Sequence, residues 1–241
     1  LRDVPDAQIT IEQQMSRDMI QTIKFDVMPH DHFKNINITK QEYDYSCGSA
    51  ALATLLNFYL GERLTEQQVI QGLMEYGDSR LIEERRAFSL LDMKQFVSVL
   101  GYQGAGYTAE LEDLKTLDKP CIVPIEFYGY KHFVVFRGMY GDHMFFADPF
   151  MGNISFTVTE FEKMWHRNIV FMVTSGESTL NALRLKEEDL RLVSFSRTAD
   201  EFLPQEGRSS ILMNEHRFKE SIGRTNSDEP RIYQFIDMNI R

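Results

Sequence analysis

Cys47 is the residue whose type and position most directly suggest chemistry. It precedes Gly48 and opens an apolar run with helical spacing, so it is expected in the first turn of a helix. Unpaired N–H groups and the dipole at a helix N-terminus stabilise a thiolate, the nucleophilic form of cysteine. Gly48 is expected to leave the backbone open to a substrate carbonyl. Cys47 is therefore a candidate nucleophile, and the alternative is a buried core cysteine.

A thiolate nucleophile needs a base, and the base needs an acceptor that orients it. His132 begins a predicted strand just after a glycine-containing loop, at the rim of a sheet. Asp148 ends the next predicted strand and precedes Pro149. If the hairpin turn centres near Tyr140, residues 132 and 148 face each other across the two strands, within reach of a carboxylate–imidazole contact. The alternatives are an ordinary edge-strand histidine and an Asp-Pro turn residue.

Acyl transfer also needs a hydrogen-bond donor for the oxyanion that develops on the substrate. Gln41 precedes Cys47 in the same predicted loop, and its amide is a candidate donor beside the Cys47 backbone N–H. Aromatic side chains in the neighbouring loops would narrow a cleft so that only glycine fits beside the scissile bond; the alternative is that half of them belong to the core. These candidate substrate-binding residues are Tyr43, Tyr45, Tyr128 and Tyr130.

Metal and cofactor chemistry find little support in the sequence. His30 and His32 have the spacing of metal ligands, but no third or fourth ligand follows at a fixed interval. The second cysteine, Cys121, lies in a buried-type strand and is expected to be core. Two cysteines also exclude a disulfide-rich scaffold and a four-cysteine zinc site. We therefore expect no metal and no cofactor.

The elements that must position these residues follow an α+β order, with helices first and an antiparallel sheet afterwards. Helices are predicted at 46–61, 65–77, 89–101 and 111–115, the second from a capping box of Thr65 and Gln68. Strands are predicted at 121–127, 132–136, 144–147, 154–158 and 169–173, with Gly141-Asp142 as a hairpin turn and a short helix capped by Thr159. Pro124 suggests that the first of these strands is an edge or carries a bulge.

The chain divides into an arm or helix at 1–32, a core region at 33–175 and an extension at 176–241. In the extension, 180–192 is a possible helix, 204–230 is loop-like and 232–240 is a possible strand. The 36 acidic residues outnumber the 26 basic ones, which argues against nucleic-acid binding and against docking on an anionic membrane. The longest uncharged stretch, 45–61, is too short and too polar for a membrane span.

The segment from Gln41 to Leu52 resembles the Q-x5-C-G-x-A-A-L motif of peptidase family C39, the double-glycine leader peptidases of bacteriocin processing and export. The resemblance covers roughly residues 33–175 and continues through Lys131-His132-Phe133 and Ala147-Asp148-Pro149. It implies a papain-like fold and cleavage after a Gly-Gly pair that ends a helical leader. It also implies Cys47 as the nucleophile, His132 as general base and then general acid, Asp148 as its orienting residue and Gln41 in the oxyanion hole.

The sequence has no Walker motif and no membrane domain, which typical exporter-linked members of that family carry. It therefore resembles the stand-alone form encoded beside secretion systems for surface or amyloid-like proteins in Gram-negative bacteria, usually behind an export signal. This implies a protein or peptide substrate, with a secreted amyloid-like protein as one candidate. Because the sequence begins with Leu, removal of a preceding segment and a periplasmic location are expected; the alternative is cytoplasmic.

Two other functions compete with a cysteine endopeptidase. In a leader-binding or partner-binding module of an export system, the extension would lie over the cleft and leave little activity. Another papain-like amide hydrolase, such as a cell-wall amidase, would also carry Cys before His. The position of Gln41 before Cys47 and the Asp148-Pro149 pair fit the C39 pattern better.

Overall fold

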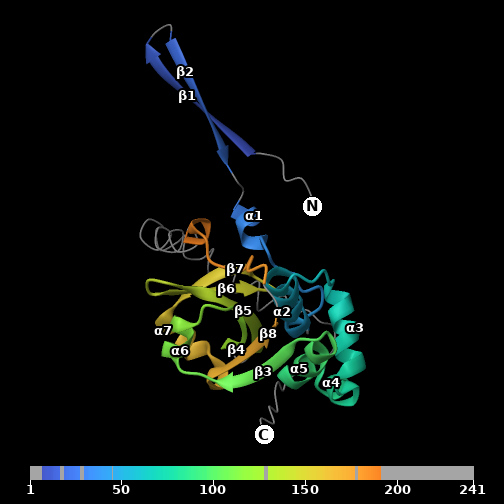
Figure 1. The fold of residues 1–241 in the computed structure, drawn as a ribbon. Helices are drawn as coiled ribbons and strands as arrows, with labels where there is room; N and C mark the ends of the chain where they lie inside the picture. Colours follow the sequence, from blue (N-terminus) through green and yellow to red (C-terminus); the bar gives the residue numbers. More distant parts are fainter. Residues whose placement is uncertain are drawn as a thin grey trace, which may run out of the picture.

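The computed structural model describes residues 7–16, 19–27, 30–44, 46–127, 130–176 and 179–190. Its first element is an antiparallel hairpin of β1 (Ala7–Ser16) and β2 (Met19–Val27), followed by α1 (His30–Asn35) (Figure 1). The expectation of a helix in this arm is therefore wrong. Apolar residues alternate with polar ones from Ile23 to Val27, and this two-residue period favours a strand over the looser helical spacing.

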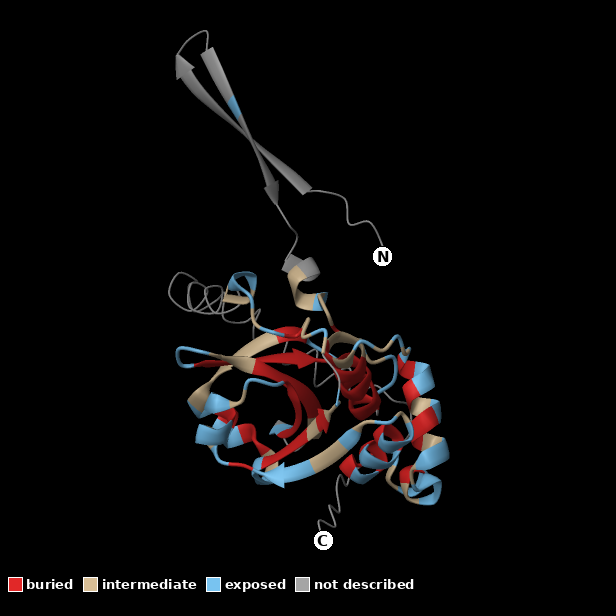
Figure 2. Cartoon of the chain, in the orientation of Figure 1, coloured by how far each residue is buried: buried red, intermediate tan, exposed pale blue. Residues whose placement is uncertain are grey.

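The helical layer begins with α2 (Cys47–Leu55), all of whose residues are buried (Figure 2). It continues into a π-helical turn, Leu56–Leu60, which ends at Gly61 with a left-handed φ of 91°. α3 (Glu66–Tyr76) and α5 (Leu90–Val99) each start with a capping box, whereas α4 (Ser79–Arg85) was not predicted. The predicted starts at Thr65 and Ser89 are confirmed because both side chains accept from the third backbone N–H of their helix.

The sheet has six antiparallel strands in the order β3-β8-β4-β5-β6-β7. The strands are β3 (Gln103–Thr108), β4 (Cys121–Phe127), β5 (Tyr130–Tyr140), β6 (His143–Asp148), β7 (Gly152–Thr157) and β8 (Ile169–Thr174). α6 (Leu111–Thr116) precedes β4, and α7 (Val158–Met164) follows β7, with Thr157 rather than Thr159 as its cap. The α+β class is confirmed.

Two apolar cores lie on the two faces of this sheet. One contains α2, α3 and α5 together with Phe133, Val135 and Phe171. The other contains α6 and α7 together with Val134, Phe136 and Phe146. β4 is an interior strand, so Pro124 does not mark an edge. Its pairing with β8 is confined to Ile122, and that ladder stops before Pro124, which has no N–H to contribute.

The segment 179–190 runs over the body of the protein in a largely irregular course. Within 179–190, only Glu187–Leu190 is helical, as a short 3-10 turn. The prediction of a helix over 180–192 is therefore wrong for residues 180–190, the part of that range that the structure describes. The backbone N–H groups of Leu180 and Ala182 donate to Tyr59 O and Phe58 O in the π-helical turn, at 2.9 and 2.8 Å. Leu183 is buried in the helix-side core. The predicted loop at 204–230 and strand at 232–240 lie outside the described residues.

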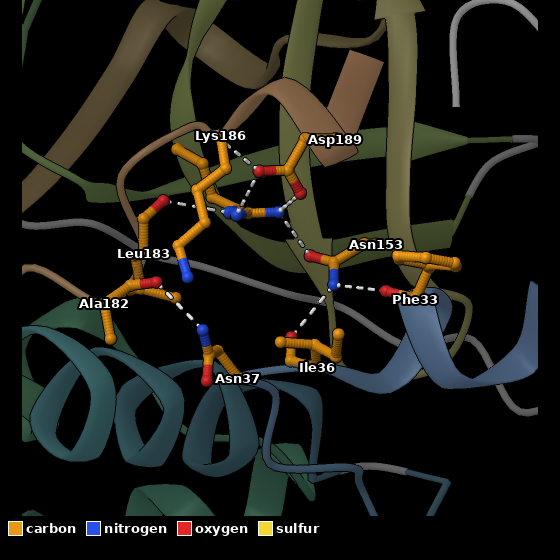
Figure 3. Close-up of polar contacts among 9 residues, drawn as sticks. Phe33, Ile36, Asn37, Asn153, Ala182, Leu183, Lys186 and Asp189 are labelled. Carbon is orange, nitrogen blue, oxygen red and sulfur yellow. Dashed lines mark hydrogen bonds and ion pairs between the residues drawn. The ribbon is translucent and has the colours of Figure 1, made fainter. Parts of the chain in front are cut away.

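Arg137 joins this segment to the sheet, and Figure 3 shows its partners Leu183, Asn153 and Asp189. Its buried guanidinium forms a two-pronged ion pair with Asp189, at 2.8 and 3.0 Å, and donates to Leu183 O and Asn153 Oδ1. The Asn153 amide in turn donates to Phe33 O and to Ile36 O, at 3.0 and 2.9 Å. One polar cluster therefore fastens the start of the domain, the sheet and the 179–190 segment together. In the described part of the chain, no helix is long and apolar enough to cross a bilayer.

We expect Asp189→Ala to lower the free energy of unfolding by about 3–5 kcal/mol, because it leaves the Arg137 charge buried without its partner. Denaturant unfolding followed by circular dichroism measures this loss. Glu187→Ala is the matched control, since Glu187 is an exposed acid in the same turn. A loss for Asp189→Ala no larger than for Glu187→Ala would contradict a stabilising role of the ion pair.

Candidate active site

Cys47 lies where the sequence predicts it, as the first residue of α2. Its side chain is nearly buried, with the residue 4% exposed. Gly48 is closely packed: a Cβ there would come within 2.9 Å of Met93 Cε and 3.3 Å of Phe133. The glycine therefore allows α2 to pack tightly against α5 and β5, which fixes the helix end that carries the thiol.

His132 and Asp148 meet at one end of the sheet. His132 Nε2 lies 3.0 Å from Asp148 Oδ1, and the Cys47 side chain is near enough to the imidazole to raise its pKa. Since Nε2 is engaged with Asp148, Nδ1 is the ring nitrogen left for the thiol. Asp148 Oδ1 also accepts from the N–H groups of Phe150 and Met151, at 2.7 and 2.9 Å. Asp148 thus both orients the imidazole and shapes the following turn, so the two roles considered for it are compatible.

The strand register that brings these residues together differs from the predicted one. The turn is Gly141-Asp142, as predicted, but the pairing is not centred on Tyr140. Phe136 pairs with Phe146, whereas Gly138 pairs with Phe145. Arg137 is thus an extra residue in β5, a β-bulge. If the register beyond the Val135–Ala147 pair is continued, Asp148 falls opposite Val134 rather than His132. The contact is therefore diagonal, and a histidine side chain is long enough to make it.

The charges of the pair reinforce each other. Burial disfavours the protonated imidazole, but the Asp148 carboxylate and Cys47 outweigh it and raise the pKa of His132 to about 10. Burial also opposes ionisation of Asp148, but His132 and the Phe150 and Met151 N–H groups lower the pKa of that carboxyl group. His132 thus stabilises the fold fully below about pH 6.5 and loses this contribution as pH rises towards 10. Asp148 contributes above about pH 3.9 and loses its contribution on acidification.

Gln41 lies in the loop before α2 and is tied to the turn after Asp148. Its backbone N–H donates to Pro149 O at 3.1 Å, and its side-chain amide donates to Tyr43 O at 3.1 Å. Within the described residues, its Oε1 is buried without a hydrogen-bond partner. The structure therefore links the loop of Gln41 to the hairpin of Asp148. An amide nitrogen has two hydrogens, so one remains for a substrate oxygen.

The structure describes two of the four tyrosines that are candidate substrate-binding residues. Tyr43 lies in the Gln41 loop and is 42% exposed, and Tyr130 is half-buried at the start of β5. Tyr45 and Tyr128 lie outside the described residues. Sequence reasoning missed Phe150 and Met151, which are exposed in the turn whose N–H groups bind Asp148. Their position directly after Asp148-Pro149 was the available indication.

The second cysteine lies on the opposite face of the sheet. Cys121 is fully buried in the core of α6 and α7, and burial raises the pKa of its thiol far above the ordinary value. It has the core position expected for it. His30 and His32 belong to α1, but the side chains of these two histidines are not described. Among the residues with described side chains, no group of three or more His, Cys, Asp or Glu is arranged to hold a metal ion.

We expect Cys47 to react faster than Cys121 with iodoacetamide in the folded protein. Cys47 lies at a helix N-terminus beside His132, which can accept the thiol proton, whereas burial suppresses ionisation of Cys121. Peptide mapping by mass spectrometry at partial modification measures both rates. Faster modification of Cys121 would contradict the assignment, and Cys47→Ala identifies the background rate of Cys121.

The chain is similar to several known proteases. The chain is 38% identical over 154 residues to the probable functional amyloid protease FapD of Pseudomonas aeruginosa. The aligned region covers 64% of this chain and 68% of that protein. It is 34% identical over 147 residues to the FapD of Pseudomonas fluorescens, covering 61% and 65%. A solved double glycine motif protease from an AMS/PCAT transporter, in complex with its leader peptide, is 27% identical with a TM-score of 0.47, covering 56% and 89%. The model of the Peptidase C39 family matches residues 35–177, so the chain belongs to the C39 family of cysteine peptidases.

Proposed function

We propose that Cys47, His132, Asp148 and Gln41 form the catalytic machinery of this C39 peptidase. The observation that carries the proposal is the 3.0 Å contact between the His132 ring and the Asp148 carboxylate, with the Cys47 side chain near enough to interact with the same ring. A thiol, an imidazole and a carboxylate in this order are the groups that nucleophilic acyl transfer requires. The series begins at a helix N-terminus, where a developing negative charge is stabilised.

In the first half-reaction, His132 takes the proton of the Cys47 thiol, and the resulting thiolate attacks the carbonyl carbon of the scissile peptide bond. The resulting oxyanion accepts hydrogen bonds from the Cys47 backbone N–H and the Gln41 amide. The C–N bond then breaks while protonated His132 gives its proton to the leaving amine, which leaves a thioester on Cys47. In the second half-reaction, neutral His132 takes a proton from water, the hydroxide attacks the thioester, and the carboxylic acid product departs as the thiolate is restored.

Asp148 supports both halves of this cycle. It accepts the Nε2–H of His132, so the ring keeps Nδ1 towards the thiol in each protonation state. Its carboxylate is held by the two N–H groups of the following turn and is therefore fixed before substrate arrives. This is preorganisation of the base, which reduces the reorganisation needed during the reaction.

We further propose a protein substrate that is cut after a Gly-Gly pair, with a secreted amyloid-like protein as the physiological target and the periplasm as the location. The support is the identity with two proteins named as functional amyloid proteases and the match to a double glycine motif protease. Tyr43, Tyr45, Tyr128 and Tyr130 are the proposed substrate-binding residues, and the exposed side chain of Tyr43 in the Gln41 loop supports this.

A second candidate function is a leader-binding module with little catalytic activity. The near-complete burial of Cys47 favours it, because a substrate carbonyl needs access to the sulfur. The described part of the extension, residues 179–190, packs on the π-helical turn and the β5 bulge, so it does not provide this cover.

The deciding experiment is cleavage of a synthetic peptide whose leader ends in Gly-Gly, followed by mass spectrometry. We expect wild-type protein to release the leader and Cys47→Ala to bind the peptide without cutting it. A trapped thioester on Cys47 after acid quench would identify the nucleophile. Cleavage by Cys47→Ala at the wild-type rate would exclude Cys47, and binding without cleavage by the wild type would favour the leader-binding module.

We expect Asp148→Asn to lower kcat by roughly 10²–10⁴ while the hairpin persists, because an amide orients the imidazole poorly. The substitution also removes the carboxylate that raises the pKa of His132 but leaves the burial that lowers it. The His132 pKa should therefore fall well below 10. An NMR titration of the ring protons in the Cys47→Ala background, with and without Asp148→Asn, measures the change. An unchanged His132 pKa and an unchanged kcat would reduce Asp148 to a turn residue.

A further inference from the structure

Glu66 is a buried carboxyl group beside the active site that the mechanism above does not use. It is the first residue of α3 and is only 4% exposed. Burial raises its pKa, the Ser46 hydroxyl and the Glu42 N–H lower it, and the Glu42 carboxylate raises it again. Burying a carboxyl group costs free energy unless its oxygens receive hydrogen bonds. The contacts of Glu66 therefore indicate what its position provides.

Those contacts are with the loop that carries Gln41. Glu66 Oε2 accepts the backbone N–H of Glu42 at 2.8 Å. The hydroxyl of Ser46, the residue before Cys47, is also in hydrogen-bonding reach of the carboxyl group, although it donates to Tyr43 O at 2.9 Å. Glu66 Oε1 is buried and has no hydrogen-bond partner in the described part of the chain. The carboxyl group therefore lies against both ends of the segment between Gln41 and Cys47.

A role in helix stability alone does not account for this arrangement. An acid in the first turn of a helix interacts favourably with the dipole, but this effect requires neither burial nor contact with another segment. The Thr65 and Gln68 capping box already satisfies the start of α3. The bond from Glu42 N–H to Glu66 instead joins α3 to a loop 24 positions earlier in the chain.

We propose that Glu66 is a positioning residue, which holds the Glu42 backbone so that the neighbouring Gln41 amide is fixed beside Cys47. The proposal rests on the proposed oxyanion role of Gln41. Gln41 N–H is bound to Pro149 O on one side, and the next peptide N–H is bound to Glu66 on the other. Two anchors on consecutive residues fix the peptide plane between them. An oxyanion donor is effective only when it is preorganised in this way.

Glu66→Asp is the principal variant, because it keeps a carboxylate at the start of α3 but withdraws it from the Glu42 N–H by one methylene. We expect kcat on the Gly-Gly peptide to fall about tenfold or more, with KM changed less than threefold. Glu66→Gln retains a carbonyl acceptor and should stay within threefold of wild type. Gln67→Ala is the matched control, since Gln67 is exposed and contacts the Glu42 side chain rather than its backbone, at 3.3 Å.

Two further readouts separate positioning from general damage. Backbone amide exchange at Glu42 should accelerate in Glu66→Asp and remain unchanged in Gln67→Ala, whether or not the peptide is cut. Iodoacetamide modification of Cys47 should keep its wild-type rate, because thiol alkylation does not use the oxyanion hole. In the double variant Gln41→Ala/Glu66→Asp, kcat should be no lower than in Gln41→Ala alone.

Several results would overturn the positioning role of Glu66 or the assignments on which it rests. Unchanged exchange at Glu42 in Glu66→Asp overturns the proposal, as does a kcat within threefold of wild type. Fully additive losses in the double variant, or a Glu66→Gln loss equal to that of Glu66→Asp, overturn it as well. If Gln41→Ala alone leaves kcat unchanged while Cys47→Ala is inactive, the oxyanion role of Gln41 fails first, and the role of Glu66 fails with it. A wild-type protein that cuts no Gly-Gly peptide contradicts the substrate assignment, while the exchange measurement still tests the Glu66 anchor.

Discussion

The bond between His132 and Asp148 is the interaction on which the rest of this structure depends. Both side chains are largely removed from water, and each stabilises the charged form of the other. The bond requires two strands to present these residues diagonally, and an extra residue in β5 sets that register. The extra residue is Arg137. The bulge that aligns the imidazole and carboxylate therefore also places a guanidinium in the interior, where it needs an acid.

Asp189 supplies that acid, which explains why the 179–190 segment folds onto the domain although it lies beyond the match to the family model. The loop before Cys47 depends on the sheet in a comparable way. Its backbone is bound to Pro149 O next to Asp148, to Glu66 in α3 and, earlier, through Thr39 N–H to Thr54 Oγ1 in α2. The site is thus held by contacts from α2, α3 and the β6–β7 turn, while none of its proposed catalytic side chains depends on the described 179–190 segment directly.

Much of this could be predicted from the sequence because the relevant patterns are local. The capping boxes mark the starts of α3 and α5, and the position of Cys47 before an apolar helical run places it at the start of α2. The strand β3 was missed because its two glycines are unfavourable in strands. A Cβ at Gly104 would lie 2.7 Å from Val97, so packing on α5 decides that residue rather than strand propensity. Neither the bulge at Arg137 nor the burial of Glu66 has a local pattern, since both depend on segments distant in sequence.

The π-helical turn after α2 has a mechanical consequence. It offers the carbonyls of Phe58 and Tyr59 to the 179–190 segment, while Arg137 and Asn153 fasten that segment and residues 33–36 to the same part of the sheet. Tension applied to the chain on either side of the domain would therefore first load this shared anchor. It would pass into β5 and β7 and into the far end of α2, away from the helix end that carries Cys47.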